Sequence, residues 1–320
     1  MKKQQTSKSF AKNILFGGLY LALTGFTSPN FENTDCYKKN EVDSKSQTIS
    51  SSLKGGSSLK KDKPRDVLIV LSPHFDDAVL SVGGILSEFD GQKYVVSFFS
   101  TPKITSQYLT DWDEMSGFDR STDARAARTN ENENATNLLG AKAINLDYID
   151  NQYQTRSASD ISSLTTAITG DIEEILESMN NDHVTIIGPS YFGEEFTHPD
   201  HRVISTAFMR AIKNKCYTDA KFYLYEDLPY THRRFGDEEI TLDAILEDFY
   251  SGLKLNKRQI SISPAAFALK MQALKLYTSQ IKAFASTEDD IVKEVTDFGM
   301  KRSLQSPLPA APCEVIYEIQ

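Results

Sequence analysis

The sequence predicts an α/β protein with a Rossmann-like, doubly wound and mainly parallel sheet. Segments typical of strands and helices alternate from residue 66 to residue 227, the usual pattern of such a sheet. The first strand segment, DVLIVLS, is apolar without interruption, as expected of a strand covered on both faces. Directly after it, apolar residues recur at helical spacing from Val79 to Phe89. With 320 residues, 40% of them hydrophobic, the chain is long enough to bury the core that this fold needs.

The further elements follow in order along the chain. Four more strands of the alternating part are predicted at 94–100, 143–149, 183–189 and 221–227. The helices between them are predicted at about 121–139, at about 160–179 and in the segment HPDHRVISTAFMRAIKN. Beyond residue 235 the pattern loosens, and we expect only a short strand in RQISIS, a helix from about 264 to 285 and a last strand in CEVIYEI.

Two segments precede the predicted folded domain, which we place at 65–320. Residues 1–28 combine lysines with a short apolar run from Ile14 to Phe26, which suits the core of a signal peptide better than a membrane span. We therefore predict export to the bacterial periplasm or cell surface, with this segment cleaved or kept as a membrane anchor; a cytoplasmic location is the alternative. Residues 29–64 are rich in Ser, Lys and Gly and predict a disordered linker.

Charge and cysteine content restrict the class of partner and the redox chemistry. Residues 1–63 hold 11 basic and 5 acidic residues, which leaves 24 basic and 39 acidic residues in the rest, a net charge of −15. Such a surface repels phosphate backbones, so we expect no nucleic-acid partner. The three cysteines, Cys36, Cys216 and Cys313, have no C-x-x-C spacing. Whether Cys216 pairs with Cys313 after export stays open, as does the oligomeric state.

Two clusters of metal-ligand side chains follow two of the predicted strands. In SPHFDD, His74, Asp76 and Asp77 come directly after the first strand, and HPDH follows the fourth strand with His198, Asp200 and His201. If the strand order is 3-2-1-4-5, both clusters lie at the switch point of the sheet, where ligands bind in this class of fold. Two imidazoles and a carboxylate suit a divalent metal with open coordination positions. The alternative for each cluster is that its aspartates cap the following helix.

The two clusters carry a resemblance to a known family. SPHFDDAVLSVGG together with HPDH resembles the PIG-L/LmbE-like family of zinc-dependent N-deacetylases, which act on N-acetylglucosaminyl conjugates. RAARTNENENATNLLGA, YEDLPY and ALKLYTSQ are similar to further segments of the family, so that the resemblance spans about 65–285. Phe75 and Ala78 depart from the family pattern, which often has proline and glutamate there. Neither position is a metal ligand in the family, so the departures affect the transfer of substrate preference and leave the chemistry intact.

The resemblance implies a role for each residue of the two clusters. His74, Asp77 and His201 would bind Zn²⁺, and Asp76 would stay free of the metal as general base. His198 would face the substrate carbonyl, either protonated or as a hydrogen-bond donor, and Asp200 would orient a histidine. The substrate would be an N-acetylated amino-sugar conjugate, hydrolysed to acetate and a free amine.

Four further residues are candidates for substrate binding. Asp150 follows the third strand and either contacts sugar hydroxyls or is a solvated loop carboxylate. Arg128 either faces the sugar or forms an exposed ion pair with Glu131, three residues later on the predicted helix. Tyr225 and Asp227 end the fifth strand, where they would form the rim of the substrate site.

Two alternative functions remain at this point. The first is a non-haem iron enzyme, which the two-histidine, one-carboxylate set also suits, and the second is a glycan-binding module that has lost catalysis. Asp76 and His198 favour hydrolysis, because that reaction needs a base and a partner for the oxyanion. The sequence has no G-x-S-x-G, G-x-G-x-x-G or P-loop pattern, which argues against a serine hydrolase, a dinucleotide enzyme or an NTPase.

Overall fold

The computed structural model describes residues 65–100, 109–179, 183–190, 198–214, 220–231, 250, 253–284, 287–304 and 311–320. The signal peptide predicted at 1–28, the linker predicted at 29–64 and the half-cystine candidate Cys216 lie outside these ranges and stay predictions. Cys313 is buried and unpaired in the part that the structure describes. None of the described helices is long and apolar enough to cross a membrane.

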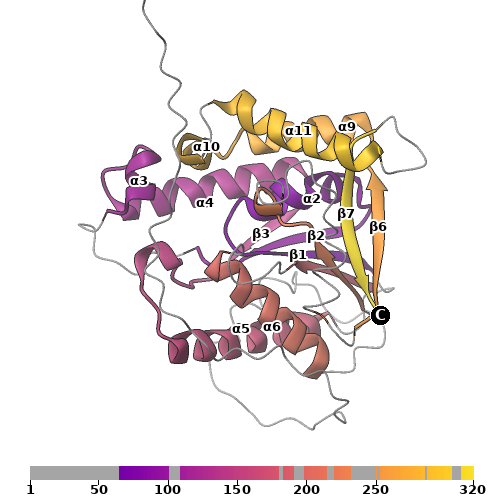
Figure 1. Cartoon of the computed structure of the whole chain (residues 1–320), viewed down its shortest axis with the longest axis horizontal. Coiled ribbons are helices and arrows are strands. Elements are labelled where there is room, and N and C mark those ends of the chain that lie inside the picture. Colours follow the sequence, from indigo (N-terminus) through magenta and orange to yellow (C-terminus); the bar gives the residue numbers. More distant parts are fainter. Residues whose placement is uncertain are drawn as a thin grey trace, which may run out of the picture. The chain divides into compact units, whose positions relative to one another are not determined.

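A seven-stranded sheet forms the centre of the described domain, in the order β3-β2-β1-β4-β5-β7-β6 (Figure 1). The first five strands along the chain run parallel, whereas β7 pairs antiparallel with both β5 and β6. The predicted order 3-2-1-4-5 and the doubly wound α/β fold are therefore confirmed. The strands are β1 (Asp66–Ser72), β2 (Gln92–Ser97), β3 (Lys142–Asn145), β4 (His183–Pro189), β5 (Lys221–Tyr225), β6 (Leu255–Ser261) and β7 (Cys313–Ile319).

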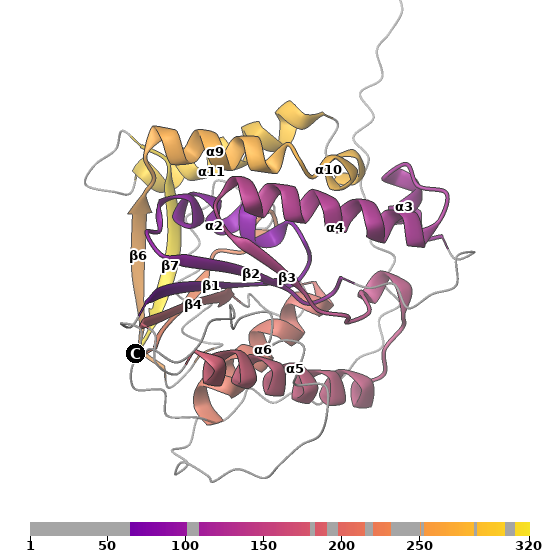
Figure 2. The same ribbon diagram turned by 180° about the vertical axis from the view of Figure 1, so that it is seen from behind.

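Helices cover both faces of the sheet, as Figures 1 and 2 show from opposite sides. One face carries α5 (Ala158–Ser178) and α6 (Pro199–Asn214). The other carries α2 (Asp77–Glu88), α4 (Ser121–Leu138), α9 (Pro264–Leu274), α10 (Thr278–Phe284) and α11 (Glu288–Leu304). Alternate residues of β1 divide between the two cores: Val67, Ile69 and Leu71 pack with α5 and α6, and Leu68 and Val70 pack on the α2 side. This two-sided burial explains the uninterrupted apolar run of β1.

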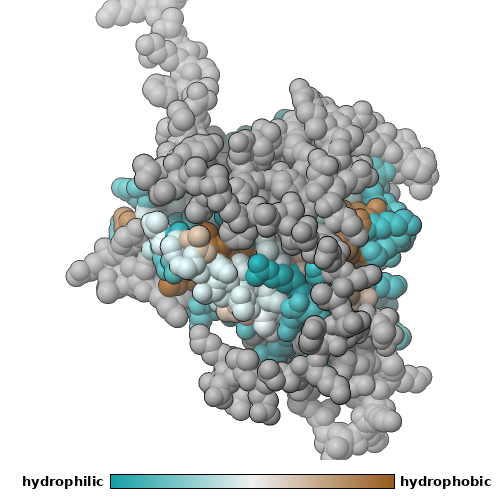
Figure 3. All heavy atoms as spheres, turned by 60° about the horizontal axis from the view of Figure 1, so that its bottom comes forward, coloured by the Kyte–Doolittle hydropathy of each residue, from teal (hydrophilic) through white to brown (hydrophobic). Residues whose placement is uncertain are grey.

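The surface of the described part is mixed in character. On the face shown in Figure 3, hydrophobic residues form small separate patches among hydrophilic ones. The large hydrophobic side chains that are more than a third exposed among the described residues are Leu109, Met115, Leu138, Leu276 and Met300.

The structure differs from the sequence prediction mainly around α4 and α10. The single helix predicted at about 264–285 is two helices, because the chain turns inward at Tyr277, whose hydroxyl lies 3.0 Å from the carbonyl oxygen of Phe75. Glu131 of α4 binds the first turn of the next helix, α10. It accepts hydrogen bonds from the Ser279 amide at 2.9 Å and the Thr278 hydroxyl at 2.8 Å. The short helix α3 (Asp111–Met115), the 3₁₀ turn η1 (Asn151–Tyr153) and α11 were not predicted.

A buried ion pair fixes α2, the helix that begins at Asp77. The helix is kinked at Val82, where φ is −132° and ψ is 27°. Behind the kink, Glu314 of β7 accepts hydrogen bonds from the amides of Gly84 and Ile85, both at 2.8 Å. Lys270 of α9 approaches the same carboxylate to 2.5 Å, and both charged side chains are almost fully buried. The kink thus exposes two amides in the middle of a helix, and a carboxylate from the last strand binds both.

We expect Glu314→Gln to lower the free energy of unfolding by about 3 kcal/mol, because it leaves the Lys270 ammonium buried without its partner. Urea unfolding followed by circular dichroism measures this loss. The double variant Lys270→Met/Glu314→Gln is expected to recover part of it, since both charges are then gone. Glu318→Gln is the control on the same strand, because its ion pair with Arg258 is exposed. Equal stability of Glu314→Gln and the parent would contradict the role given to this pair.

Candidate metal centre

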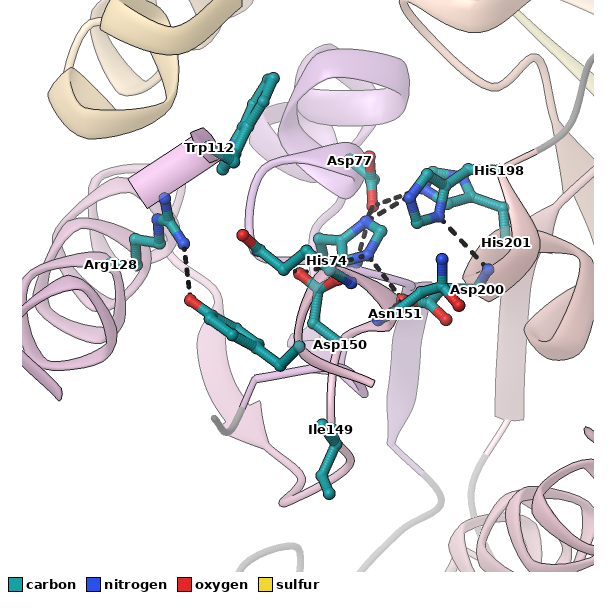
Figure 4. A network of polar contacts seen from close by, with 12 residues as sticks. His74, Asp77, Trp112, Arg128, Ile149, Asp150, Asn151, His198, Asp200 and His201 are labelled. Carbon is teal, nitrogen blue, oxygen red and sulfur yellow. Dashed lines mark hydrogen bonds and ion pairs between the residues drawn. The ribbon is translucent and has the colours of Figure 1, made fainter. Parts of the chain in front are cut away.

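The two ligand clusters meet at the carboxyl ends of β1 and β4. These strands pair in parallel, with Val70 opposite Ile187. His74 lies in the loop after β1, and His201 lies in the first turn of α6. The His74 Nδ1 and His201 Nε2 atoms are 3.1 Å apart, although 127 positions separate the residues in the sequence (Figure 4). The two clusters therefore lie in one site, as the predicted strand order required.

Three ligand atoms form a nearly equilateral triangle in this site. Asp77 Oδ2 lies 3.4 Å from His74 Nδ1 and 3.3 Å from His201 Nε2, which completes the triangle begun by the two imidazole nitrogens. Ligands about 2.1 Å from a tetrahedral zinc ion are about 3.4 Å apart, so the three atoms fit one such ion. The residues predicted to bind the metal thus have the spacing and the donor types that zinc requires, with one position left for water or substrate.

Other groups of possible ligands share these residues. A ring nitrogen of His198 lies within 4.8 Å of ring nitrogens of His74 and His201. A carboxylate oxygen of Asp227 lies within the same distance of possible ligand atoms of Asp77 and His201. Asp227, however, contacts Nδ1 of His201, the ring atom opposite the triangle. One imidazole cannot direct both of its nitrogens to the same ion, so Asp227 supports the ligand from behind.

Carboxylates dominate the electrostatics of the triangle. Burial would raise the pKa of Asp77, but His201 and His74 outweigh burial and hold that pKa at about 2. Burial would lower the pKa of His201, but the Asp227 and Asp77 carboxylates outweigh it and raise this pKa. Burial would also lower the pKa of His74, but the nearby carboxylates, chiefly Asp150, outweigh burial and raise the pKa of His74 well above its ordinary value. A bound cation would replace the protons that these histidines otherwise attract.

Asp76 lies beside the triangle and makes no helix cap. Its backbone occupies the N-cap position of α2, but its side chain makes no capping hydrogen bond. The residue is 8% exposed. Burial, and then the charge of Asp77, raise the pKa of Asp76 to about 7. The capping alternative is therefore wrong for Asp76, and the group is able to exchange a proton near neutral pH.

His198 is a neutral hydrogen-bond donor in this arrangement. Its Nδ1 accepts a hydrogen bond from the Asp200 amide at 3.3 Å, which leaves the proton on Nε2. Burial, and then the charge of His74, lower the pKa of His198 to about 3. Of the two forms left open by the sequence, the structure favours the neutral ring that donates through Nε2.

Asp200 and Asp227 lie behind the two histidines of the triangle. The Asp200 carboxylate lies 3.2 Å from His74 Nε2, and Asp227 lies 2.5 Å from His201 Nδ1; both aspartates are fully buried. Asp200 thus contacts a histidine, as the family resemblance implied. Asp227 and Tyr225, expected at the substrate rim, instead lie beneath the site, and the Tyr225 hydroxyl donates to the Leu71 carbonyl oxygen at 3.1 Å. Residues at the end of a central strand point into the covering layers, which is why the rim prediction misplaced them.

The remaining substrate candidates differ in their access to the site. Asp150 lies 3.9 Å from His74 Nε2 and keeps 15% of its side chain exposed, so it lines the site. Arg128 is buried and pairs with Asp113 of α3 at 2.8 Å, so the exposed pair with Glu131 that the helical spacing suggested does not form. Figure 4 shows Arg128 well to one side of His74. Its ion pair holds α3 against α4.

Sequence reasoning missed two residues that support the site, Arg156 and Tyr277. Arg156 pairs with Asp200, and Tyr277 contacts the backbone of Phe75, next to Asp76. Tyr277 was within the segment ALKLYTSQ, so the resemblance marked its position without a role. No local pattern marked Arg156, because its partner lies 44 residues away.

Comparison with known proteins agrees with this geometry. Residues 69–212, from within β1 to near the end of α6, match the model of the family described as PIG-L, GlcNAc-PI de-N-acetylase. This segment of the chain is therefore similar to the PIG-L family. The matched range contains both ligand clusters, and the resemblance inferred from their motifs is confirmed. None of the curated proteins matches the chain.

Solved structures share the fold of this chain. The zinc-inhibited form of teicoplanin deacetylase is 20% identical, with a TM-score of 0.64 over 79% of this chain and 98% of that one. An antimicrobial pseudoaglycone deacetylase is 22% identical, with a TM-score of 0.62 over 81% and 98% of the two chains. The N,N′-diacetylchitobiose deacetylase of Pyrococcus horikoshii is 17% identical, with a TM-score of 0.54 over 88% and 95%.

We expect Asp76→Asn to stabilise the metal-free protein, and more so at about pH 8 than at about pH 5. The ordinary pKa of 3.8 rises to about 7 on folding, so the parent loses stability as the pH rises through this window, and the asparagine variant does not. Melting temperatures in the presence of a chelator measure the difference. Asp90→Asn, at an exposed position, is the control. A gain that is the same at both pH values would show that Asp76 is not perturbed.

Proposed function

We propose that this protein is a zinc-dependent hydrolase that removes the N-acetyl group from an N-acetylglucosamine-type conjugate, giving acetate and a free amine. The observation that carries the proposal is the triangle of His74 Nδ1, Asp77 Oδ2 and His201 Nε2, with sides of 3.1 to 3.4 Å. The description of the PIG-L family as a de-N-acetylase supports the reaction type. Two of the similar structures, a teicoplanin deacetylase and a diacetylchitobiose deacetylase, support an acylated amino sugar as substrate.

The donor set is what an amide hydrolase needs. An acetamide is a poor electrophile and neutral water a poor nucleophile; zinc held by these three atoms would polarise the carbonyl and acidify a water molecule. The side chains around the triangle then have to move a proton and stabilise negative charge. Asp76 and His198 are suited to these two tasks.

Asp76 is the proposed general base. Because burial and Asp77 raise its pKa to about 7, the carboxyl group can accept the proton of the attacking water and later return it to the departing amine. Asp77 cannot share this task, since its pKa is held at about 2 and its Oδ2 faces both histidines. The two adjacent carboxylates thus divide the work of ligand and base.

His198 is the proposed partner of the oxyanion. Its neutral ring directs a proton on Nε2 away from the Asp200 amide, which holds Nδ1. A donor of this kind stabilises the tetrahedral oxyanion by about 3 kcal/mol in comparable sites. Asp150, partly exposed beside His74, is placed to accept a hydrogen bond from a sugar hydroxyl. We make no such proposal for the buried Arg128, Tyr225 and Asp227.

Replacing the base is expected to separate catalysis from metal binding. Asp76→Asn should keep zinc and lose about 10² to 10⁴ in turnover, because the proton acceptor is gone while the triangle is intact. His74→Ala and His201→Ala should lose the metal itself. Metal content and the rate of acetate release measure both effects, with Asp90→Asn as the control. Full turnover of Asp76→Asn would refute its assignment as base.

Exchange of the metal tests the reaction class. After removal by a chelator, zinc is expected to restore acetate release by the full-length protein from a panel of N-acetylated sugars, including N-acetylglucosamine and diacetylchitobiose. Oxygen uptake restored by ferrous iron, without acetate release, would support the non-haem iron alternative instead. Zinc binding with no acetate from any sugar of the panel would support the inactive glycan-binding alternative.

A further inference from the structure

Asp200 is a fully buried carboxylate that joins three separate parts of the chain. Its Oδ2 lies 3.2 Å from His74 Nε2 and accepts a hydrogen bond from the Asn151 amide at 2.9 Å. Its Oδ1 is bound by the guanidinium of Arg156. Figure 4 shows Asp200 and Asn151 together on one side of His74. The start of α6, the loop after β1 and the loop around η1 therefore converge on this one side chain.

Arg156 is held as firmly as the carboxylate that it binds. Only 4% of its side chain is exposed. Its Nη2 donates to the carbonyl oxygen of Ile149, and its guanidinium lies over the ring of Phe99, 5.0 Å from the centroid. Phe99 in turn lies beside His74, with 6.1 Å between the ring centroids. A lysine has no planar fork that could make these contacts at once.

The contact with Asp200 determines which nitrogen of His74 faces the triangle. With Nε2 directed at Asp200, the ring presents Nδ1 to His201 and to Asp77. The carboxylate can serve His74 in this way only while its orientation is fixed. Arg156 fixes it by binding Oδ1, so that Oδ2 remains for His74 and the Asn151 amide.

We propose that Arg156 is a positioning residue of the metal centre: it orients Asp200, which keeps His74 Nε2 protonated and its Nδ1 directed at the cation. The inference rests on the proposed function, because it assumes that the triangle binds zinc. Arg156 itself touches neither the triangle nor a substrate. Its effect passes through Asp200, which also makes Asp200 a positioning residue and not a group that reacts.

The affinity for zinc tests this proposal directly. Competition with a chromophoric chelator on the full-length protein gives the dissociation constant of the parent, of Arg156→Met and of Arg156→Lys. We expect Arg156→Met to bind zinc about 10 to 100 times more weakly, the usual effect of losing such a supporting partner. Arg156→Lys should lie between this variant and the parent, because an ammonium can restore the charge but not the bond to Ile149. Arg120→Met is the control, since the ion pair of Arg120 with Asp123 is exposed.

A double-variant cycle separates a positioning role from a general loss of stability. If Arg156 acts through Asp200, then Arg156→Met/Asp200→Asn should bind zinc as Asp200→Asn alone does, within about twofold. The imidazole ¹⁵N spectrum of the zinc-loaded parent should show His74 protonated at Nε2, and this signature should change in Arg156→Met. Should Arg156→Met fail to fold, the lysine variant and the double variant, which buries no unpaired charge, still decide the question.

Two results would overturn the proposal. One is a dissociation constant of Arg156→Met, or of Arg156→Lys if the methionine variant does not fold, within about twofold of the parent. The other is a double variant whose loss equals the product of the two single losses. A parent protein that binds no zinc would instead refute the proposed function, so the two failures are distinguishable.

Discussion

The parallel pairing of β1 with β4 is the constraint on which the candidate centre depends. It runs from Asp66 opposite His183 to Val70 opposite Ile187, and it ends both strands at the same edge of the sheet. A slip by one residue would displace one loop by about 3.3 Å, as much as the whole distance between the two imidazole nitrogens. The Ser72 hydroxyl stabilises the turn beyond β1, since it donates to the His74 carbonyl oxygen at 2.6 Å and accepts from the Ala78 amide at 3.0 Å. Register and turn together place the ligand atoms.

The centre buries several carboxylates within a small volume, and each has a different form of compensation. Asp77 faces two histidines, Asp227 faces one, and Asp200 has the cation of Arg156. Burial raises the pKa of Asp227 in spite of its histidine, whereas Asp76 makes no ion pair with the described residues around the triangle, and burial and the charge of Asp77 raise its pKa to about 7. The least compensated carboxyl group is thus the one with a pKa suited to proton transfer. Burial and the charge of Asp77 destabilise the ionised form of Asp76 in the folded protein. The same two effects give Asp76 a pKa that suits a base.

The sequence predicted the parts of the site that depend on local patterns. Apolar strands, the order of elements and the H-x-D-D and HPDH clusters were all visible, and the switch-point rule was enough to bring the clusters together. The Arg156–Asp200 pair and the contact of Tyr277 with Phe75 join residues far apart in the sequence. Contacts of this kind produce no local pattern from which they could be predicted. Local reasoning failed in the same way for Arg128: three-residue spacing suggested Glu131 as its partner, but Glu131 serves the first turn of α10 and Arg128 pairs with Asp113. Arg128 and Glu131 lie on the buried face of α4. The usual amphipathic pattern places charged residues on the exposed face of a helix, so it does not predict this arrangement.

The position of β7 has a consequence for the order of folding. This strand lies between β5 and β6, and it brings Glu314 to the kink of α2. During synthesis, β1 to β5 and both ligand clusters emerge well before residues 313–319. The helix that carries Asp77 therefore lacks its internal support until this late strand inserts. Long-range pairings of this kind are slow to form, so the residues of the candidate centre have all been synthesised before the strand that supports the helix of Asp77.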